Sequence, residues 1–355
     1  MSPASPSPGF LTVTTTWREA PASARSRAHG LFADRSALGR TGADGLVVLH
    51  TCARSTWWAS AREPAWVGQI IAAQVERSVG VEPLVRVGEA GLRHALEVSI
   101  GLDSFVQGEG DIGRQVHLAL GANDRRDRTI NLLAQSIEQL RARGRTDGFV
   151  RPNVGVGVLA VEQLVGMPRE LSIAVVGLGE IGGRVVASLR RSGWPAPTVY
   201  NRSPRSGARL LSEMQPHDVW FVCSAGPEGW FQPPGEPVLV VDLGVPTQVG
   251  PLPAATRRAA VDQLVTGPRR ALPVATLQAA QSAVDEALAA LLARLAAPQN
   301  RLGRLRDLRD GFLADLDNHI PLDGLSTEQQ AMVRKATRAA LRAYTHQIIR
   351  ALGEP

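Results

Sequence analysis

The chain is poor in cysteine and has no long apolar run. Its two cysteines, Cys52 and Cys223, lie far apart and form no Cys-x-x-Cys or Cys/His spacing, which argues against a disulfide framework and against a metal site. No uninterrupted apolar stretch is long enough to cross a bilayer, and no basic-then-apolar leader opens the chain. We therefore expect a cytoplasmic protein with no membrane partner.

Lysine is almost absent: Lys335 is the only lysine in the sequence. The formal net charge of +6 therefore comes from arginine, and it permits an anionic partner such as RNA without requiring one. Hydrophobic residues make up 44% and charged residues 20% of the 355 residues, which is typical of a folded chain with two or three domains.

A glycine-rich turn over 171–183 is the most informative local pattern. It predicts a buried strand that passes directly into a helix, and the spacing Gly177-x-Gly179-x-x-Gly182 fits the dinucleotide fingerprint. The first glycine permits the tight turn, the second lets the backbone approach a pyrophosphate, and the third permits close helix packing. The alternative is a glycine-lined turn that binds nothing. The candidate cofactor-binding residues are Gly177, Leu178, Gly179, Glu180, Ile181, Gly182, Asn201, Arg202 and Ser203.

The next expected strand, 197–200, indicates which dinucleotide binds. It ends in Asn201-Arg202-Ser203-Pro204-Arg205 and offers no acid for a ribose hydroxyl. A 2′-phosphate prefers arginine and hydroxyl donors, so the sequence favours NADP(H) over NAD(H). Both arginines could instead be solvated loop residues.

The N-terminal third predicts a small α+β domain. We expect strands over 10–16, 45–50 and 84–87 and a helix over 64–78, with a polar loop over 51–56. Cys52 in that loop is either a nucleophile or an inert buried thiol.

A helix over 89–100 carries His94, which is either catalytic or structural. The polar, glycine-rich segment 101–115 is expected to be a binding loop between two helices.

The C-terminal part predicts two further buried strands, 218–225 and 238–246, and then helices only. An apolar stripe over 277–295 resumes over 302–316, and we expect it to form a dimer interface, with a helix over 327–352 able to fold back on it. The basic residues of this end form either a solvated face or an RNA contact. They are Arg301, Arg304, Arg306, Arg309, Arg334, Lys335, Arg338 and Arg342.

With these segments placed, the chain resembles the glutamyl-tRNA reductase family along nearly its full length. The motifs occur in the family's order, and together they are more specific than any one of them. They are Thr51-Cys52-Ala53-Arg54, His94 before Gly101-Leu102-Asp103-Ser104, Glu109 and Gln115, Arg145-Thr146, Gly177 to Gly182, Asn201-Arg202-Ser203, and Asp242-x-x-Val245-Pro246.

The resemblance implies an α/β multidomain fold assembled as a V-shaped homodimer. It implies an N-terminal α+β catalytic domain over 1–152, a central Rossmann-like NADP-binding domain over 153–270, and a helical linker and dimerisation domain over 271–355 on a long spinal helix.

The resemblance also implies a reaction. The Cys52 thiolate would attack the ester of glutamyl-tRNA(Glu), and NADPH would reduce the resulting thioester to glutamate-1-semialdehyde, the first step of tetrapyrrole (5-aminolevulinate) biosynthesis. His94 would assist proton transfer or orient the ester. Glutamate-1-semialdehyde aminomutase is a candidate transient partner. The implied substrate-binding residues are Thr51, Ala53, Arg54, Ser104, Glu109, Gly110, Asp111 and Gln115.

Several residues depart from the family pattern in the substrate half. Ala53 replaces an Asn, Thr56 an acid, Gly110-Asp111 a Pro-Gln pair, Gly155 and Gly157 serines, and Thr247-Gln248 an Arg-Asp pair. Three alternatives therefore stay open: a homologue acting on another aminoacyl-tRNA, a tRNA-binding protein without catalysis, and a tRNA-independent NADP-dependent dehydrogenase of a small acid.

Overall fold

The computed structural model describes residues 9–32, 36–121, 127–151, 154–265, 271–297 and 326–351. The strands are β1 (Phe10–Thr16), β2 (Gly45–His50), β3 (Arg54–Ser60), β4 (Leu84–Val87), β5 (Ile173–Val176), β6 (Thr198–Asn201), β7 (Arg209–Leu210), β8 (Val219–Val222), β9 (Leu239–Asp242) and β10 (Arg257–Ala260). The helices are α1 (Ala22–Arg27), α2 (Ser36–Thr41), α3 (Pro64–Val79), α4 (Glu89–Ser99), α5 (Asp111–Gly121), α6 (Arg128–Thr146), α7 (Val156–Glu162), α8 (Glu180–Arg191), η1 (Leu211–Glu213, a 3-10 turn), α9 (Val261–Val265), α10 (Val274–Ala296) and α13 (Thr327–Ala351).

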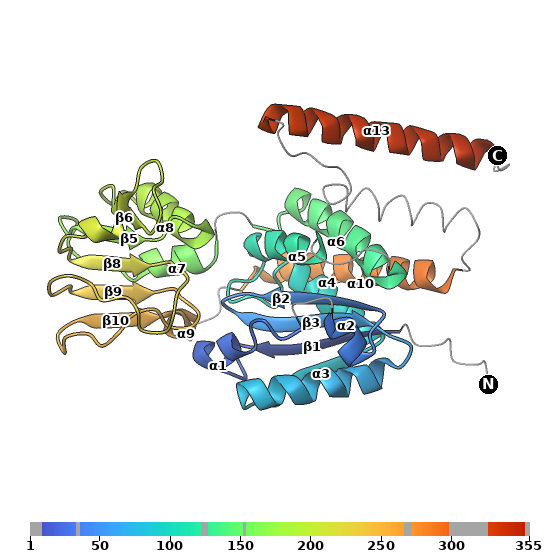
Figure 1. Ribbon diagram of the computed structural model, residues 1–355, viewed down its shortest axis with the longest axis horizontal. Helices are drawn as coiled ribbons and strands as arrows, with labels where there is room; N and C mark the ends of the chain where they lie inside the picture. The colour runs from blue at the N-terminus through green and yellow to red at the C-terminus, as the bar shows by residue number, and fades with distance from the viewer. Residues whose placement is uncertain are drawn as a thin grey trace.

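The first domain is built on an antiparallel sheet with the strand order β2-β3-β1-β4. Helix α3 covers one face through Val67, Ile71 and Val75. Helices α4, α5 and α6 cover the other face, as Figure 1 shows. This arrangement confirms the α+β architecture expected for the N-terminal third.

The second domain contains a six-stranded parallel sheet with the order β10-β9-β8-β5-β6-β7. Numbered along the chain, this is the 3-2-1-4-5-6 order of dinucleotide-binding sheets. Helices α7, α8 and α9 pack on one face, whereas the other face is covered by irregular segments that contribute Phe231 and Val249. The strand, turn and helix expected over 171–183 are present as β5 and α8.

Helix α10 returns from the second domain to the first. Its apolar stripe, including Val284, Leu288 and Leu291, lies in the same core as α4 and α6. Arg128, at the start of α6, donates hydrogen bonds to three carbonyl oxygens at the end of α10. The expectation that this stripe needs a second copy is therefore wrong for 274–296, because the first domain of the same chain buries it.

The structure also bears on the remaining expectations for loops and for the C-terminal part. The loop expected over 51–56 is a tight turn, because β3 already begins at Arg54, and the loop expected over 101–115 ends where α5 begins at Asp111. The stripe over 302–316 and the basic residues between 301 and 309 lie outside the described residues. Helix α13 is present as expected, and its described side chains are mainly exposed or half-buried.

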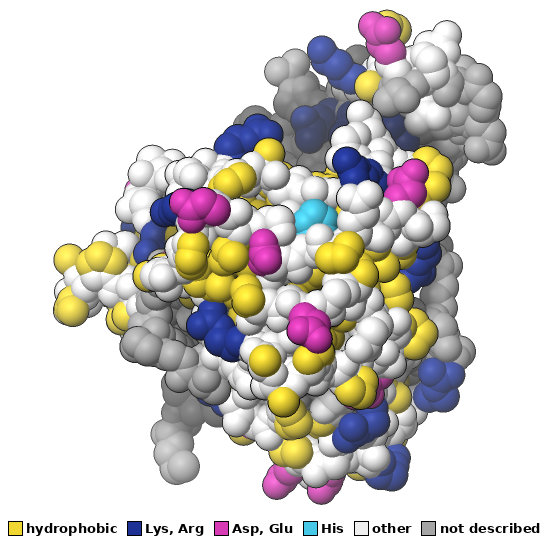
Figure 2. All heavy atoms as spheres, turned by 90° about the vertical axis from the view of Figure 1, so that its left-hand side faces the viewer, with side chains coloured by type: hydrophobic (Ala, Val, Ile, Leu, Met, Phe, Trp, Pro, Cys, Tyr) yellow, Lys and Arg dark blue, Asp and Glu magenta, His cyan; other side chains and the backbone are white. Residues whose placement is uncertain are grey.

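None of the helices in the described ranges combines the length and apolar character needed to span a bilayer. Figure 2 looks onto the end of the molecule that carries the parallel sheet. Among the described residues, basic side chains are spread there between acidic and apolar ones.

We expect Leu288→Ala to lower the free energy of unfolding by about 3 kcal/mol, because it removes a buried side chain from the core shared by α10, α4 and α6. Urea unfolding followed by circular dichroism measures the change. Leu118→Ala, at an exposed position of α5, is the matched control. A loss that vanishes at high protein concentration would instead indicate that a second copy buries Leu288.

Candidate active site

Cys52 and Ala53 form the tip of the hairpin between β2 and β3. The backbone N–H of Thr51 donates to the Arg54 carbonyl (2.8 Å), and the Thr51 hydroxyl accepts from the N–H groups of Ala53 and Arg54 (3.1 Å each). The Thr51 hydroxyl therefore fixes the turn. Short hairpin turns set the direction of their tip residues, and Cys52 lies beyond the ends of β2 and β3.

Cys52 lies against the second domain. Together with Trp17 it packs on the cluster formed by Ala53, Phe105 and the helix-covered face of the parallel sheet. Burial and the charge of Glu109 raise the pKa of the Cys52 thiol to about 12, although Arg25 and Arg54 act in the opposite direction. The thiol is therefore protonated at neutral pH in this arrangement.

Arg25 connects the cysteine turn to both domains. It is fully buried on α1, where its Nη2 donates to the Cys52 carbonyl oxygen (2.5 Å) and lies 3.2 Å from the carboxylate of Asp262 on α9. Asp262 also accepts a hydrogen bond from the Ala22 N–H at the start of α1 (2.7 Å). The position of the turn thus depends on a contact between the domains.

Asp103 is the centre of a charged cluster beside the turn. Its carboxylate lies 2.8 Å from Arg54, 2.8 Å from Arg18 and 3.4 Å from His94 Nε2. Burial alone would raise the pKa of Asp103, but the His94 hydrogen bond and the charges of Arg54 and Arg18 hold it well below its usual range. The Arg54 guanidinium and the His94 ring are therefore both oriented by Asp103.

His94 is buried on α4, and burial lowers the pKa of its ring despite the hydrogen bond to Asp103. Its Nδ1 atom has no hydrogen-bond partner among the described residues. In a neutral ring whose Nε2–H donates to the Asp103 carboxylate, Nδ1 carries the lone pair and is available as a hydrogen-bond acceptor.

Glu109 is enclosed between the domains. Its carboxyl group is hydrogen-bonded to Ser104, and a Cβ at Gly155 would lie 2.8 Å from its Oε2. Burial, reinforced by the charge of Asp111, raises the pKa of Glu109 to about 7. A carboxyl group with this pKa exchanges protons near neutral pH. In its ionised form it binds an ammonium group well.

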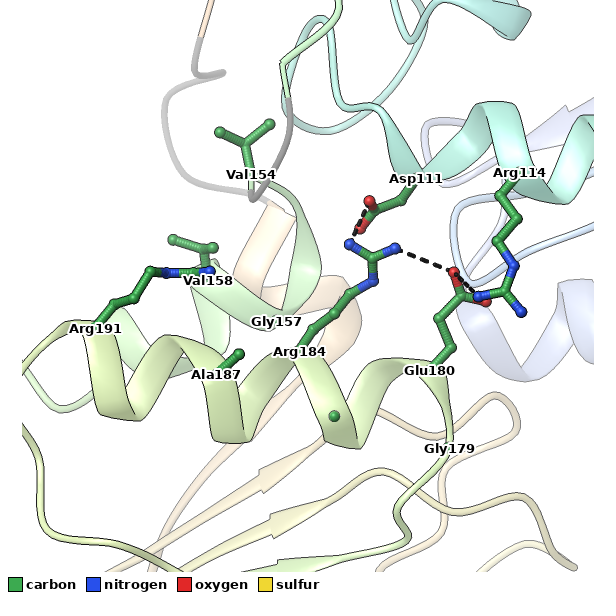
Figure 3. A pocket seen from close by; sticks show the side chains of 11 residues that line it. Asp111, Arg114, Val154, Gly157, Val158, Gly179, Glu180, Arg184, Ala187 and Arg191 are labelled. Atoms are coloured by element: carbon green, nitrogen blue, oxygen red, sulfur yellow. Dashed lines mark hydrogen bonds and ion pairs between the residues drawn. The ribbon is translucent and has the colours of Figure 1, made fainter.

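A cavity of about 320 Å³ lies between α5, α7 and α8, and its lining includes Asp111, Gly157 and Gly179. Figure 3 shows Arg184 of α8 pointing at Asp111, at a distance of 2.5 Å, and at Glu180, at 3.2 Å. Arg114 approaches the same Glu180 from α5 (3.5 Å). This chain of ion pairs joins the helix after the glycine turn to the helix after Glu109.

The glycine turn has the geometry that its spacing predicts. Gly177 has a φ of +92°, a Cβ at Gly179 would meet nothing within 4 Å, and one at Gly182 would collide with the Gly177 carbonyl. Open space above Gly179, at the N-terminus of α8, is what a pyrophosphate requires.

Residues at the end of β6 and directly after it contact this turn and the loop after β8. The Asn201 side chain accepts from the Leu178 N–H (3.4 Å), Arg205 donates to the Leu178 carbonyl, and Arg202 donates to the Ala225 carbonyl (2.9 Å). Ser203 is exposed beside them.

The remaining candidates lie further from the cysteine turn. Gly110 donates its N–H to the Arg151 carbonyl (3.0 Å), Asp111 pairs with Arg184, and Gln115 is half-buried on α5. Ile181 packs on the cluster beneath the parallel sheet. Within the described ranges, no group of three His, Cys, Asp or Glu side chains is arranged to hold a metal ion.

Two important residues, Arg25 and Asp103, were not singled out from the sequence. Asp103 lies inside the Gly101-Leu102-Asp103-Ser104 motif, so a buried-charge argument could have found it. Arg25 has no local signal, because its partner Asp262 is distant in the sequence.

The cysteine turn of an α+β domain packs against a parallel sheet of dinucleotide-binding topology, so the chain is a multidomain α/β protein with a dinucleotide-type second domain. Residues 10–146 match the family described as "Glutamyl-tRNAGlu reductase, N-terminal domain". Residues 10–146 thus correspond to the N-terminal domain of the glutamyl-tRNA reductase family, and the chain is similar to members of that family beyond this domain.

Curated relatives carry the same name. The chain is 31% identical over 253 residues to glutamyl-tRNA reductase 2 of a Nocardioides species, covering 59% of this chain and 55% of that protein. It is 34% identical over 204 residues to glutamyl-tRNA reductase 1 of Pyrobaculum calidifontis (51% and 54%) and 29% identical over 311 residues to the reductase of Pyrobaculum neutrophilum (79% and 77%). The match thus spans about half the length of the first two relatives.

Among solved structures, the glutamyl-tRNA reductase from Methanopyrus kandleri aligns over 96% of this chain and 94% of that chain. The sequence identity is 22% and the TM-score 0.46, too low to compare domain arrangements.

We expect the stability of the wild type relative to Glu109→Gln to fall as the pH rises from 4.5 to about 7. Over this range the unfolded chain releases the Glu109 proton while the folded chain keeps it, so unfolding becomes more favourable by on the order of 3 kcal/mol. Urea unfolding of both proteins between pH 4 and 8 measures the difference. A difference that stays constant with pH would contradict the raised pKa.

Proposed function

We propose that this chain is an NADPH-dependent glutamyl-tRNA reductase that forms a thioester on Cys52. The observation that carries the proposal is the position of Cys52, at the tip of a hairpin and against the core of the dinucleotide-type domain. A thiol placed there can accept an acyl group from one side and meet a reduced nicotinamide from the other.

The first step is acyl transfer. The Cys52 sulfur attacks the ester carbon of glutamyl-tRNA, the bond to the ribose oxygen breaks, and the proton lost by the thiol passes to that oxygen. We assign the transfer to His94, whose Nδ1 would accept the thiol proton and then donate it to the ribose oxygen, while Asp103 holds Nε2. Because the charge of Glu109 raises the pKa of the thiol, an α-ammonium group paired with Glu109 would lower it, so that substrate binding activates the nucleophile.

Arg54 is the proposed partner of the substrate's side-chain carboxylate. Asp103 occupies its Nη1, whereas its Nε has no hydrogen-bond partner among the described residues. The Arg54 guanidinium therefore keeps a buried donor for a second carboxylate.

The residues around the glycine turn fit NADPH. The open space above Gly179 accommodates a pyrophosphate, and Arg202, with no acid at the end of β6, suits a 2′-phosphate. When bound, the cofactor supplies the hydride that reduces the thioester to an aldehyde and releases the thiolate.

The domain limits 1–152, 153–270 and 271–355, the homodimer and a transient complex with an aminomutase remain part of this proposal. The intramolecular packing of α10 assigns 274–296 to the core of the first domain, so a dimer interface has to be sought elsewhere in the last segment.

We expect incubation with glutamyl-tRNA in the absence of NADPH to add one glutamyl group to the protein, seen by intact-mass spectrometry. Cys52→Ala abolishes the adduct because it removes the nucleophile, whereas Cys223→Ala, the matched control for a thiol, keeps it. Addition of NADPH converts the adduct to glutamate-1-semialdehyde in proteins that retain Cys52.

Other results distinguish the alternatives. Semialdehyde formation by Cys52→Ser would exclude thioester catalysis, and reduction of free glutamate as fast as of glutamyl-tRNA would indicate a tRNA-independent dehydrogenase. A tRNA charged with another amino acid that gives a larger adduct yield would reassign the substrate.

We expect Arg202→Glu to weaken NADPH binding by about tenfold or more relative to its effect on NADH, because it replaces a partner of the 2′-phosphate by a like charge. Isothermal titration calorimetry with both dinucleotides measures the ratio. Arg190→Glu, in the last turn of α8, is the matched charge reversal. Equal weakening of both cofactors would show that Arg202 does not contact the phosphate.

A further inference from the structure

The loop after β8 brings an aromatic side chain to the carboxyl edge of the parallel sheet. Trp230 is half-buried, and its indole packs on the loop-covered face of the sheet, with the ring centroid of Phe231 at 5.6 Å. Trp230 belongs to none of the sequence motifs. An indole at this edge presents a flat apolar surface where dinucleotides bind in sheets of this topology.

Trp230 is held in place by a buried polar network. Its Nε1 donates to Gln248 Oε1 (2.6 Å), and the Gln248 amide donates to the carbonyl oxygens of Gly226 (3.0 Å) and Pro246 (2.6 Å). Gln248 is fully buried, and its backbone N–H donates to the Asp242 carboxylate (3.0 Å). Because every link in this network is satisfied, the indole has little freedom to rotate.

Arg202, in the loop after β6, lies close to the Trp230 ring. Its Cζ atom lies 5.8 Å from the centroid of the Trp230 ring, and its Nη2 donates to the Ala225 carbonyl (2.9 Å). Strands β6 and β8 flank β5, so groups that follow them lie on either side of the glycine turn. A ring and a cation therefore face each other beside the fingerprint loop.

We propose that Trp230 and Arg202 form the adenosine subsite of NADPH, in which Trp230 stacks on the adenine ring and Arg202 pairs with the 2′-phosphate. This inference rests on the proposed use of NADPH. Adenine stacks on aromatic rings independently of any phosphate, and a guanidinium recognises phosphate by charge. The two residues therefore divide the recognition: Trp230 binds NADPH and NADH alike, whereas Arg202 distinguishes them.

The test is calorimetric titration of the full chain with NADPH, NADH and ADP-ribose. Trp230→Ala raises the Kd of all three about tenfold, the size of one lost base–aromatic stack. Trp230→Phe keeps a ring against the base and stays within a few fold of the wild type, which also separates stacking from folding. Trp66→Ala, at a position of α3 that is 58% exposed, is the matched control and leaves all three Kd values unchanged.

The outcomes separate this inference from the proposed function. If NADPH binds the wild type and Trp230→Ala equally well, or if Trp230→Ala weakens NADPH but not NADH, the adenine contact is refuted while the reductase proposal stands. If NADPH binding depends on Trp230 but no glutamyl-tRNA is reduced, the reductase proposal fails and the subsite stands. If no dinucleotide binds the wild type, both fail.

Discussion

The buried guanidinium of Arg25 links the cysteine turn to the second domain, and the geometry of the site depends on it. A cation with no exposed surface is stable only when its donors meet acceptors. Arg25 Nη1 and Nη2 find them in the Ala20 carbonyl, the Cys52 carbonyl and Asp262, whereas its Nε has no hydrogen-bond partner among the described residues. The two carbonyls belong to the first domain and Asp262 to α9 of the second, so the contact with Asp262 forms only when the two domains meet.

The charges around the turn are nearly balanced before any ligand binds. Asp103 neutralises Arg54, and the raised pKa of Glu109 leaves that acid partly protonated near neutral pH. A low-dielectric site without uncompensated charge can enclose a protonated thiol at little cost. A substrate that brings an ammonium group and a carboxylate adds both signs at once, so it need not disturb this balance.

Patterns local in sequence predicted most elements, and long-range contacts account for what they missed. The turn over 171–183 was predictable because its glycine spacing and apolar strand are adjacent. Strand β3 was missed because its polar and apolar residues come in blocks, Arg54-Ser55-Thr56 followed by Trp57-Trp58-Ala59, and do not alternate. Periodicity predicted helix α10 but could not say that α4 and α6 bury it, and no local feature marks the pairing of Arg25 with Asp262 or of Trp230 with Gln248.

The return of α10 to the first domain means that the chain crosses between the two cores twice, once between 151 and 156 and once between 265 and 272. The dinucleotide-type domain is thus inserted into the first domain. The second domain is therefore held to the first by two covalent connections and by the packed contact between Arg25 and Asp262, so the cysteine turn and the parallel sheet belong to one continuous pair of cores.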